Sequence, residues 1–389
     1  MYLDQRGFVR ACCMNDSQLL GNVADARLID IWRGEPAQEL RRAMERHDFG
    51  LGCDYCAWQV ERDRASTAFA RWFDKLPVDS AMPEWPRQLE LAISNTCNLQ
   101  CAMCNGEWSS SIRSRRERLP PLEKVYDERF FDDLRDFIPH LKQVKLLGGE
   151  PFLAAETLRV LDLLVEVGTD ATIHVTTNGT QWTPRAERVL DALPIDIAVS
   201  IDAATRATYE SIREGASWDD LTRNLDLFAE KARQRGTWLS ITFCLMTLNW
   251  HEFAEFCWMA DDRGINCDVN TVMQPDHLSL FKLPAPELAE VVDGLDAIDA
   301  QHGARFGPSR RVWTAELDRL RRHLTDRSVG RTITNVDTHA PDTTMRSTFE
   351  RSVQVHLATK GGDDPVEGRP ADPAPRAPVA HDGPGHGDG

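Results

Sequence analysis

Six short β-prone runs alternate with helical patterns through the middle of this chain, and this alternation limits the possible folds most. The runs cover 89–94, 143–147, 172–177, 195–201, 238–246 and 267–273. Repeated strand–helix units form a parallel sheet with right-handed crossovers. Six units are too few for a closed eight-stranded barrel. We therefore expect an α/β fold, a partial (β/α)6 TIM-like barrel whose chemistry lies at the C-terminal ends of its strands.

The parts of the chain around this barrel differ in composition. We expect a small Cys-rich α+β module, a Pro-containing linker, the barrel, a helical extension and a disordered tail, at 1–72, 73–88, 89–285, 286–330 and 331–389. The last 25 residues contain six Pro and five Gly, a composition that cannot bury enough apolar surface to fold.

The charge balance and the absence of apolar runs argue against two classes of partner. Lys plus Arg number 45 and Asp plus Glu number 61, which gives a net charge of −16. A protein that binds a nucleic-acid backbone needs a basic surface. No apolar run approaches the ~18 residues of a membrane span, and the first ten residues lack a signal-peptide core. We expect a cytoplasmic protein with neither nucleic acid nor membrane as a partner.

Seven of the ten cysteines fall into two clusters, and in a reducing compartment such clusters more often bind metal than form disulfides. The members are Cys12, Cys13, Cys53 and Cys56, and then Cys97, Cys101 and Cys104. The second cluster has the spacing C-x3-C-x2-C directly after the first β-prone run. Three thiolates on one short loop suit a cubane iron–sulfur cluster in which one iron has no protein ligand. A zinc site with a distant fourth ligand is the alternative.

A strand followed by C-x3-C-x2-C resembles the signature of the radical SAM superfamily, and the resemblance covers about residues 89–275. It implies that Cys97, Cys101 and Cys104 hold a [4Fe–4S] cluster whose open iron chelates S-adenosylmethionine (SAM). Three further motifs occur in the family's order, each after a β-prone run: Gly148-Gly149-Glu150-Pro151, Thr177-Asn178-Gly179, and Ser200-Ile201-Asp202 followed by Arg213.

The resemblance also assigns roles to these motif residues. It implies that Gly148, Gly149 and Glu150 hold the methionyl amino group and that Asn178 lies near the cofactor. Ser200 and Arg213 would bind its carboxylate and ribose, and a guanidinium suits a carboxylate because the pair is bidentate and charge-assisted. Met103 stands where the family often has an aromatic residue and would pack against the adenine.

The N-terminal cysteines resemble the twitch/SPASM modules of the same superfamily, which bind an auxiliary [4Fe–4S] cluster. The resemblance implies that Cys12, Cys13, Cys53 and Cys56 supply its ligands. Adjacent side chains of an extended segment point in opposite directions, so we expect only one of Cys12 and Cys13 to bind. Relatives typically carry another Cys before this stretch. Its absence after Met1 predicts either a truncated start or an unusual fourth ligand. A four-thiolate zinc ribbon remains the alternative.

Some other residues are candidates for contact with a substrate. Strand alternation places Cys244 on the same face as Ser240 and Thr242. There it is a candidate hydrogen-atom donor or, alternatively, a small buried apolar residue. Polar residues at the end of the sixth run and after the cysteine loop are either substrate contacts or ordinary loop residues: Asn270, Gln274, Asp276, His277, Trp108, Ser109, Ser110 and Ser111.

The resemblance therefore implies a radical SAM enzyme. Reductive cleavage of SAM at the cluster would give a 5′-deoxyadenosyl radical that abstracts hydrogen from a peptide, sugar or other small-metabolite substrate. The outcome would be oxidation, epimerisation or bond formation, with a flavodoxin- or ferredoxin-type electron donor. The alternative is a non-catalytic iron–sulfur or zinc-binding interaction protein.

Overall fold

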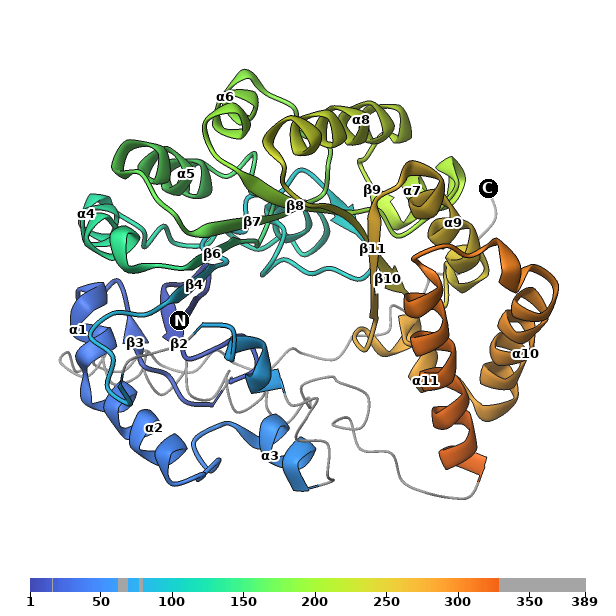
Figure 1. The fold of residues 1–389 in the computed structure, drawn as a ribbon, viewed down its shortest axis with the longest axis horizontal. Helices are drawn as coiled ribbons and strands as arrows, with labels where there is room; N and C mark the ends of the chain where they lie inside the picture. Colours follow the sequence, from blue (N-terminus) through green and yellow to red (C-terminus); the bar gives the residue numbers. More distant parts are fainter. Residues whose placement is uncertain (16, 62–68, 77–79, 329–389) are drawn as a thin grey trace, which may run out of the picture.

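The computed structural model describes residues 1–15, 17–61, 69–76 and 80–328. Its centre is an open, curved parallel sheet with helices on the convex side (Figure 1). The six parallel strands are β4 (Gln88–Leu91), β6 (Gln143–Leu146), β7 (Thr172–Thr177), β8 (Ile195–Ser200), β10 (Leu239–Leu245) and β11 (Asn266–Thr271). The predicted six-unit partial barrel is therefore confirmed.

Helices connect these strands and cover the outer face of the sheet. They are α4 (Glu128–Phe137), α5 (Ala155–Val167), α6 (Pro184–Ala192), α7 (Arg206–Ile212), α8 (Trp218–Arg235) and α9 (Phe253–Arg263). Capping residues determine where several of these helices begin or end. Thr183, Thr205 and Ser217 accept N-capping hydrogen bonds. Gly236 and Gly264 end α8 and α9 in the left-handed conformation.

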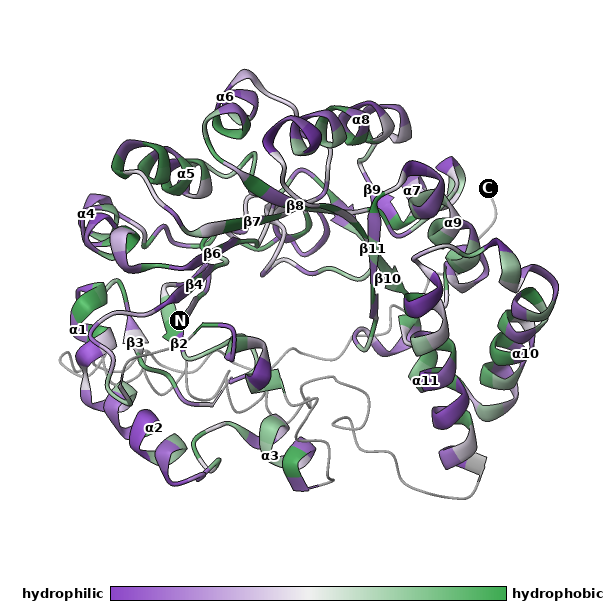
Figure 2. Cartoon of the chain, in the orientation of Figure 1, coloured by the Kyte–Doolittle hydropathy of each residue, from purple (hydrophilic) through white to green (hydrophobic). Residues whose placement is uncertain are grey.

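The strands of the sheet contain both hydrophobic and hydrophilic residues, as the colours in Figure 2 show, and buried positions alternate with less buried ones along β7 and β8. The outer face packs aliphatic side chains such as Val144, Ile173 and Ile197 against the helices, and each is at most 1% exposed. The inner face carries polar side chains at the alternating positions. Because the period of a strand is two residues, the alternation in the sequence already determines which side chains face inward.

The N-terminal module extends the same sheet, which the sequence did not predict. β1 (Tyr2–Leu3) pairs in parallel with β4 and antiparallel with β2 (Phe8–Arg10), and β3 (Gly21–Asn22) forms the edge. Helices α1 (Leu28–Arg33), α2 (Glu35–Glu45) and α3 (Asp54–Glu61) and the short 3-10 helix η2 (Phe69–Phe73) complete it.

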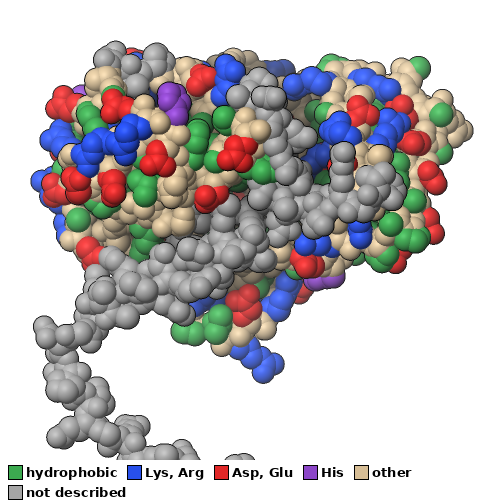
Figure 3. All heavy atoms as spheres, turned by 90° about the horizontal axis from the view of Figure 1, so that it is seen from below, with side chains coloured by type: hydrophobic (Ala, Val, Ile, Leu, Met, Phe, Trp, Pro, Cys, Tyr) green, Lys and Arg blue, Asp and Glu red, His purple; other side chains and the backbone are tan. Residues whose placement is uncertain are grey.

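At the other edge of the sheet, α10 (Ala285–His302) and α11 (Arg310–Ser328) pack together beside β11 (Figure 1). No helix in the described ranges is both long and apolar enough to cross a membrane. On the described surface seen in Figure 3, basic and acidic side chains are interspersed. The tail predicted at 331–389 lies outside the described residues, and the expected domain boundaries stay predictions.

Candidate functional site

The loop after β4 carries Cys97, Cys101 and Cys104 and is held at both ends. Cys101 lies in the short strand β5 (Gln100–Cys101), which pairs with β9 (Arg213–Glu214) so that Cys101 faces Arg213 across the ladder. Cys104 closes the loop, because its backbone N–H donates to the carbonyl of Cys101 at 3.1 Å. These contacts bring the predicted cysteine loop and the predicted arginine into one place.

The serines after this loop hold its backbone. Ser109 Oγ donates to the carbonyl of Leu99 at 2.6 Å, and Ser111 Oγ to the carbonyl of Cys97 at 2.9 Å. The backbone N–H of Cys97 donates to Ser110 Oγ at 3.1 Å. The structure therefore uses these hydroxyls within the protein, although the sequence left open that they contact a substrate.

Burial raises the pKa of all three thiols, to about 11 for Cys101 and about 12 for Cys104. The guanidinium of Arg213 acts against this increase at each of them, whereas the neighbouring thiols add to it at Cys101 and Cys104. The three sulfur atoms thus lie close enough to influence one another electrostatically. Thiolates at such a site need a positive partner, which the irons of a cluster provide.

Among the residues that the structure describes, no three His, Cys, Asp or Glu side chains are arranged to hold one metal ion. A cubane makes a different demand, because each thiolate binds a different iron. Three thiols around one loop fit that requirement.

The Gly148-Gly149-Glu150 segment packs directly against the cysteine loop. Gly149 has φ of +55°, and a Cβ there would lie 2.4 Å from the carbonyl oxygen of Thr96. Only glycine allows this close approach. The backbone N–H of Glu150 then donates to the same carbonyl oxygen at 2.7 Å.

The carboxylate of Glu150 is fully buried and joins this segment to the turn after β7. It accepts hydrogen bonds from the backbone N–H of Asn178 and the hydroxyl of Thr177, both at 2.7 Å, and from the N–H of Phe152 at 3.0 Å. Burial raises its pKa although these hydrogen bonds favour the ionised form. Both carboxylate oxygens therefore position the backbone around the loop.

Asn178 reaches back to the loop as well. Its Nδ2 lies 3.9 Å from Cys97 Sγ and donates to Asn98 Oδ1 at 3.1 Å. The motif predicted to lie near the cofactor is thus in contact with the first of the three cysteines.

Arg213 is buried in an ion pair that the sequence analysis did not assign to the site. Its Nη2 lies 2.5 Å from Asp202 Oδ2, its Nε donates to the carbonyl of Ile201 at 3.2 Å, and its Nη1 lies 3.8 Å from Cys101 Sγ. Burial acts to lower the pKa of Arg213, but the Asp202 carboxylate together with Cys101, Cys244 and Tyr209 outweighs this effect and raises the pKa. The sequence motif includes Asp202, but its ion pair with Arg213 was not predicted.

Asp202 also connects β8 to β10. It has φ of +65°, an unusual backbone conformation for a residue other than glycine. Its Oδ1 accepts the N–H of Cys244 at 2.7 Å, and its carbonyl accepts Nδ2 of Asn249 at 2.9 Å. Ser200 stands two residues earlier, opposite Thr242. The predicted cofactor residues therefore lie around one charged, buried centre.

Met103 and Cys244 lie beside the same small apolar cluster. This cluster consists of Ile212, Met246, Val272 and Leu278. Burial raises the pKa of the Cys244 thiol well above its usual value. On the neighbouring strand, Asn270 lies opposite Cys244 and is exposed. Gln274, Asp276 and His277 lie in the segment after β11, and the last two are exposed.

The N-terminal cysteines separate into two groups. Cys12, Cys53 and Cys56 interact electrostatically, and burial raises the pKa of each, to about 11 for Cys53. Asn15 Nδ2 lies 3.6 Å from Cys53 Sγ and donates to the carbonyl of Leu51 at 2.9 Å.

Cys13 lies in a different environment. Burial raises its pKa to about 12, and its strongest charged neighbour is Glu90, followed by Cys12 and Lys145. Glu90 and Lys145 belong to β4 and β6, so Cys13 faces the sheet. The two adjacent thiols thus have different charged neighbours, although residues 11–14 form a bend and a turn and not the extended segment on which the prediction was based.

A row of charged side chains crosses the inner face of the sheet at one level. The strand registers align Glu90, Lys145, His174 and Asp196. Lys145 Nζ lies 3.9 Å from Glu90 Oε2, and His174 Nδ1 lies 3.4 Å from Asp196 Oδ2. Burial lowers the pKa of His174 although Asp196 opposes this shift. The concave side of the sheet is therefore polar.

Comparison with known proteins gives matches over both parts of the chain. Residues 91–258 match the model of the radical SAM superfamily, and residues 1–57 match the SPASM iron–sulfur cluster-binding domain. A GTP 3′,8-cyclase of Erythrobacter litoralis is 27% identical over 240 residues, which is 59% of this chain and 68% of that protein. A probable GTP 3′,8-cyclase of Methanocaldococcus jannaschii is 27% identical over 177 residues, 44% of this chain and 55% of that protein.

An AdoMet-dependent heme synthase of Methanosarcina barkeri is 31% identical over 138 residues, 34% of this chain and 36% of that protein. The chain thus spans between about a third and two thirds of the length of these relatives. Among solved structures, native anSMEcpe with bound AdoMet aligns with a TM-score of 0.43 at 15% identity, over 57% of this chain and 63% of the other.

The radical SAM and SPASM domains imply S-adenosylmethionine and [4Fe–4S] clusters as cofactors. The two domain matches occur in the order of the two cysteine clusters. The chain therefore carries a radical SAM domain at residues 91–258, preceded by a SPASM iron–sulfur cluster-binding domain at residues 1–57.

Proposed function

We propose that this protein cleaves SAM reductively at a cluster held by Cys97, Cys101 and Cys104 and modifies a peptide, sugar or other small-metabolite substrate. When bound, the cluster and SAM supply a 5′-deoxyadenosyl radical able to abstract hydrogen from carbon. The observation that carries the proposal is the hydrogen-bonded loop of three thiols, in which the buried Cys101 faces the Arg213–Asp202 pair.

The surrounding residues would position the cofactor. The backbone at Gly148 and Gly149 lies close against the segment that leads into the loop, and the buried Glu150 carboxylate holds that turn against Asn178. Because the Glu150 oxygens already accept three hydrogen bonds, we assign Glu150 a positioning role and the neighbouring backbone the contact with the methionyl amino group.

Arg213, Ser200 and Met103 would contact other parts of SAM. Arg213 is held by Asp202, and a cation fixed in this way attracts the SAM carboxylate without having to reorganise. Ser200 lies at the C-terminal end of β8, where ligands bind in such sheets. Met103 offers an apolar surface for the adenine.

Cys12, Cys53 and Cys56 would hold the auxiliary cluster, and we leave Cys13 outside its ligand set. Support comes from the mutual interactions of the first three thiols and from the position of Cys13 beside Glu90 and Lys145. A flavodoxin- or ferredoxin-type protein would deliver the electron.

The polarity of the inner face of the sheet favours a polar substrate. Glu90, Lys145, His174 and Asp196 present charged groups along it, and a polar molecule can replace water at such groups with hydrogen bonds of its own. Cys244, beside the Arg213–Asp202 pair, is the candidate hydrogen-atom donor if the reaction is an epimerisation. The relatives named above carry out different reactions, so their names do not choose among oxidation, epimerisation and bond formation.

The test is the formation of 5′-deoxyadenosine by anaerobically prepared protein incubated with dithionite and SAM. We expect this product from the unaltered chain, and we expect Cys101→Ala to abolish it. Cys257→Ala is the matched control, because Cys257 is also buried but belongs to α9, where its thiol interacts with Cys267 of β11. Equal yields from Cys101→Ala and the unaltered chain would refute the assignment of the loop.

A further inference from the structure

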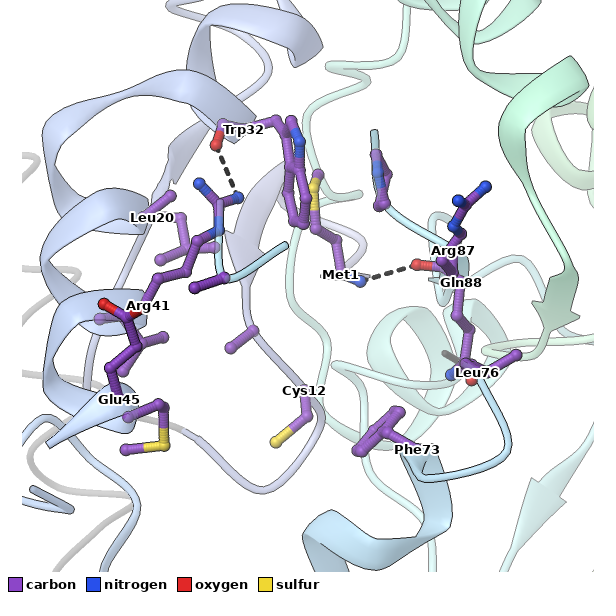
Figure 4. Close-up of a pocket in the computed structure, with 16 residues that line it drawn as sticks. Met1, Cys12, Leu20, Trp32, Arg41, Glu45, Phe73, Leu76, Arg87 and Gln88 are labelled. Carbon is purple, nitrogen blue, oxygen red and sulfur yellow. Dashed lines mark hydrogen bonds between the residues drawn. The ribbon is translucent and has the colours of Figure 1, made fainter. Parts of the chain in front are cut away.

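A cavity of about 580 Å³ lies between the N-terminal module and the start of β4. Its walls are mostly apolar and include Leu20, Trp32, Leu40, Met44, Phe73 and Leu76. Figure 4 shows Arg41 and Glu45 of α2 on one side of it and Phe73 and Leu76 on the other. This volume and this lining are typical of sites for small organic molecules, which are concave, largely apolar and equipped with few polar groups.

The cavity is distinct from the candidate site described above. Gln88, which lines it, begins β4, whereas the cysteine loop follows the last residue of that strand, Leu91. The wall includes Cys12 but neither Cys53 nor Cys56. The cavity therefore adjoins the proposed auxiliary-cluster site at Cys12, whereas its other walls, among them Trp32, Leu40, Phe73 and Leu76, belong to neither proposed cluster site.

Arg41 places a positively charged guanidinium in the otherwise mostly apolar wall of the cavity. Its guanidinium stacks on the ring of Trp32, 3.9 Å from the centroid, and its Nη2 donates to the carbonyl of Trp32 at 2.8 Å (Figure 4). Burial lowers its pKa, and no acidic group contributes to that shift.

No carboxylate of the described chain lies within ion-pair distance of Arg41. Glu45 lies on the next turn of the same helix and is exposed. The neighbouring Arg42, in contrast, pairs with Glu35. A guanidinium that has lost part of its hydration without gaining an anion is unfavourable, and an anionic ligand would remove this cost.

We propose that this cavity binds a small amphipathic carboxylate, whose apolar body fills the space between α2 and η2 and whose carboxylate pairs with Arg41. Arg41 retains further N–H donors beyond the one bound to Trp32, and a guanidinium matches a carboxylate bidentately. The indole of Trp32 fixes the plane of the guanidinium, so little side-chain entropy is lost on binding.

The test compares three ligands with the same chain length: octanoate, octanol and octylamine. Each is titrated by calorimetry into the anaerobically prepared, cluster-loaded full chain, below the concentration at which the ligand aggregates. We expect octanoate to bind with 1:1 stoichiometry and at least about 10-fold more tightly than octanol, as a charge-assisted hydrogen bond allows. We expect octylamine to bind most weakly.

Three variants locate the binding. Arg41→Gln should weaken octanoate at least about 10-fold and leave octanol unchanged, whereas Arg42→Gln should leave both unchanged. Ala81→Trp, at an exposed position in the wall, should weaken octanoate and octanol alike because the indole fills the cavity.

The proposal is overturned if octanoate binds no more tightly than octanol, if Arg41→Gln and Arg42→Gln have equal effects, or if Ala81→Trp leaves binding unchanged. If Arg41→Gln does not fold, the preference of the unaltered chain for octanoate over octanol and the effect of Ala81→Trp still test the proposal. Since none of these readouts requires SAM cleavage, they are independent of the proposed function.

Discussion

The buried pair of Arg213 and Asp202 allows a quantitative test of how the site is held together. The side chain of Asp202 is 0% exposed and that of Arg213 is 7% exposed, with 2.5 Å between Nη2 and Oδ2. Removing one partner of such a pair leaves a buried charge without compensation, which typically destabilises a protein by about 3–5 kcal/mol. We therefore expect Asp202→Asn and Arg213→Met each to lower the free energy of unfolding by about that amount.

The double variant shows whether the cost arises from the pair. With both charges removed, no buried charge remains alone, and the loss should be smaller than the sum of the two single losses by about 2–3 kcal/mol, the upper part of the range for residues in contact. Asn at 202 keeps an oxygen that can accept the N–H of Cys244, so this contact is preserved in the comparison.

The assay is urea unfolding followed by tryptophan fluorescence for the four proteins of the cycle. The control is Asp219→Asn, which breaks the solvent-exposed pair with Arg206 and should leave the unfolding midpoint unchanged. If the two single losses add up in the double variant, Arg213 and Asp202 do not act as a pair, and the account of this centre is wrong.

Three further predictions concern other parts of the site. Gly149→Ala forces a Cβ against the cysteine-loop backbone and should cost about 2 kcal/mol or more, whereas Gly236→Ala, in the left-handed conformation with nothing within 4 Å of its Cβ, should cost less in the same unfolding assay. The carboxylate of Glu252, just before α9, accepts hydrogen bonds from the backbone N–H groups of Ala204 and Thr205 before α7. Burial alone would raise the pKa of Glu252, but these hydrogen bonds lower it. Its contribution to stability is then present above the usual carboxyl pKa and is lost as the pH falls through the native value, so unfolding curves of Glu252→Gln should depend less on pH below about 5. Cys12→Ala should remove about four irons per chain, whereas Cys13→Ala should retain them, as measured by iron analysis; equal iron contents would contradict the division of the two thiols.

Much of the fold was predictable because alternation and helix-ending signals are local. The two-residue period of β7 and β8 predicted these strands. The glycines after α8 and α9 predicted where these connecting helices end. The addition of β1 to the edge of the barrel was not predictable, because a two-residue strand carries no periodicity and depends on pairing with β4, which begins 85 residues after β1 ends.

The candidate site was predictable where a motif is contiguous and less so where it depends on contacts. The three-cysteine loop and its glycine turn were recognisable by spacing. Asp202 was not assigned, because its role depends on a salt bridge to Arg213, 11 residues later. The serines after Cys104 were ambiguous in the sequence, since a hydroxyl that holds a backbone carbonyl looks the same as one that faces a ligand.

The most direct test of the account is electron paramagnetic resonance of the reduced, anaerobically prepared protein before and after addition of SAM. The account predicts about eight irons per chain if both sites are filled, and a [4Fe–4S] signal that changes when SAM occupies the open iron. The change should be lost in Cys101→Ala and kept in Cys12→Ala. Colourless protein with stoichiometric zinc, or an iron signal that SAM leaves unchanged, would contradict it.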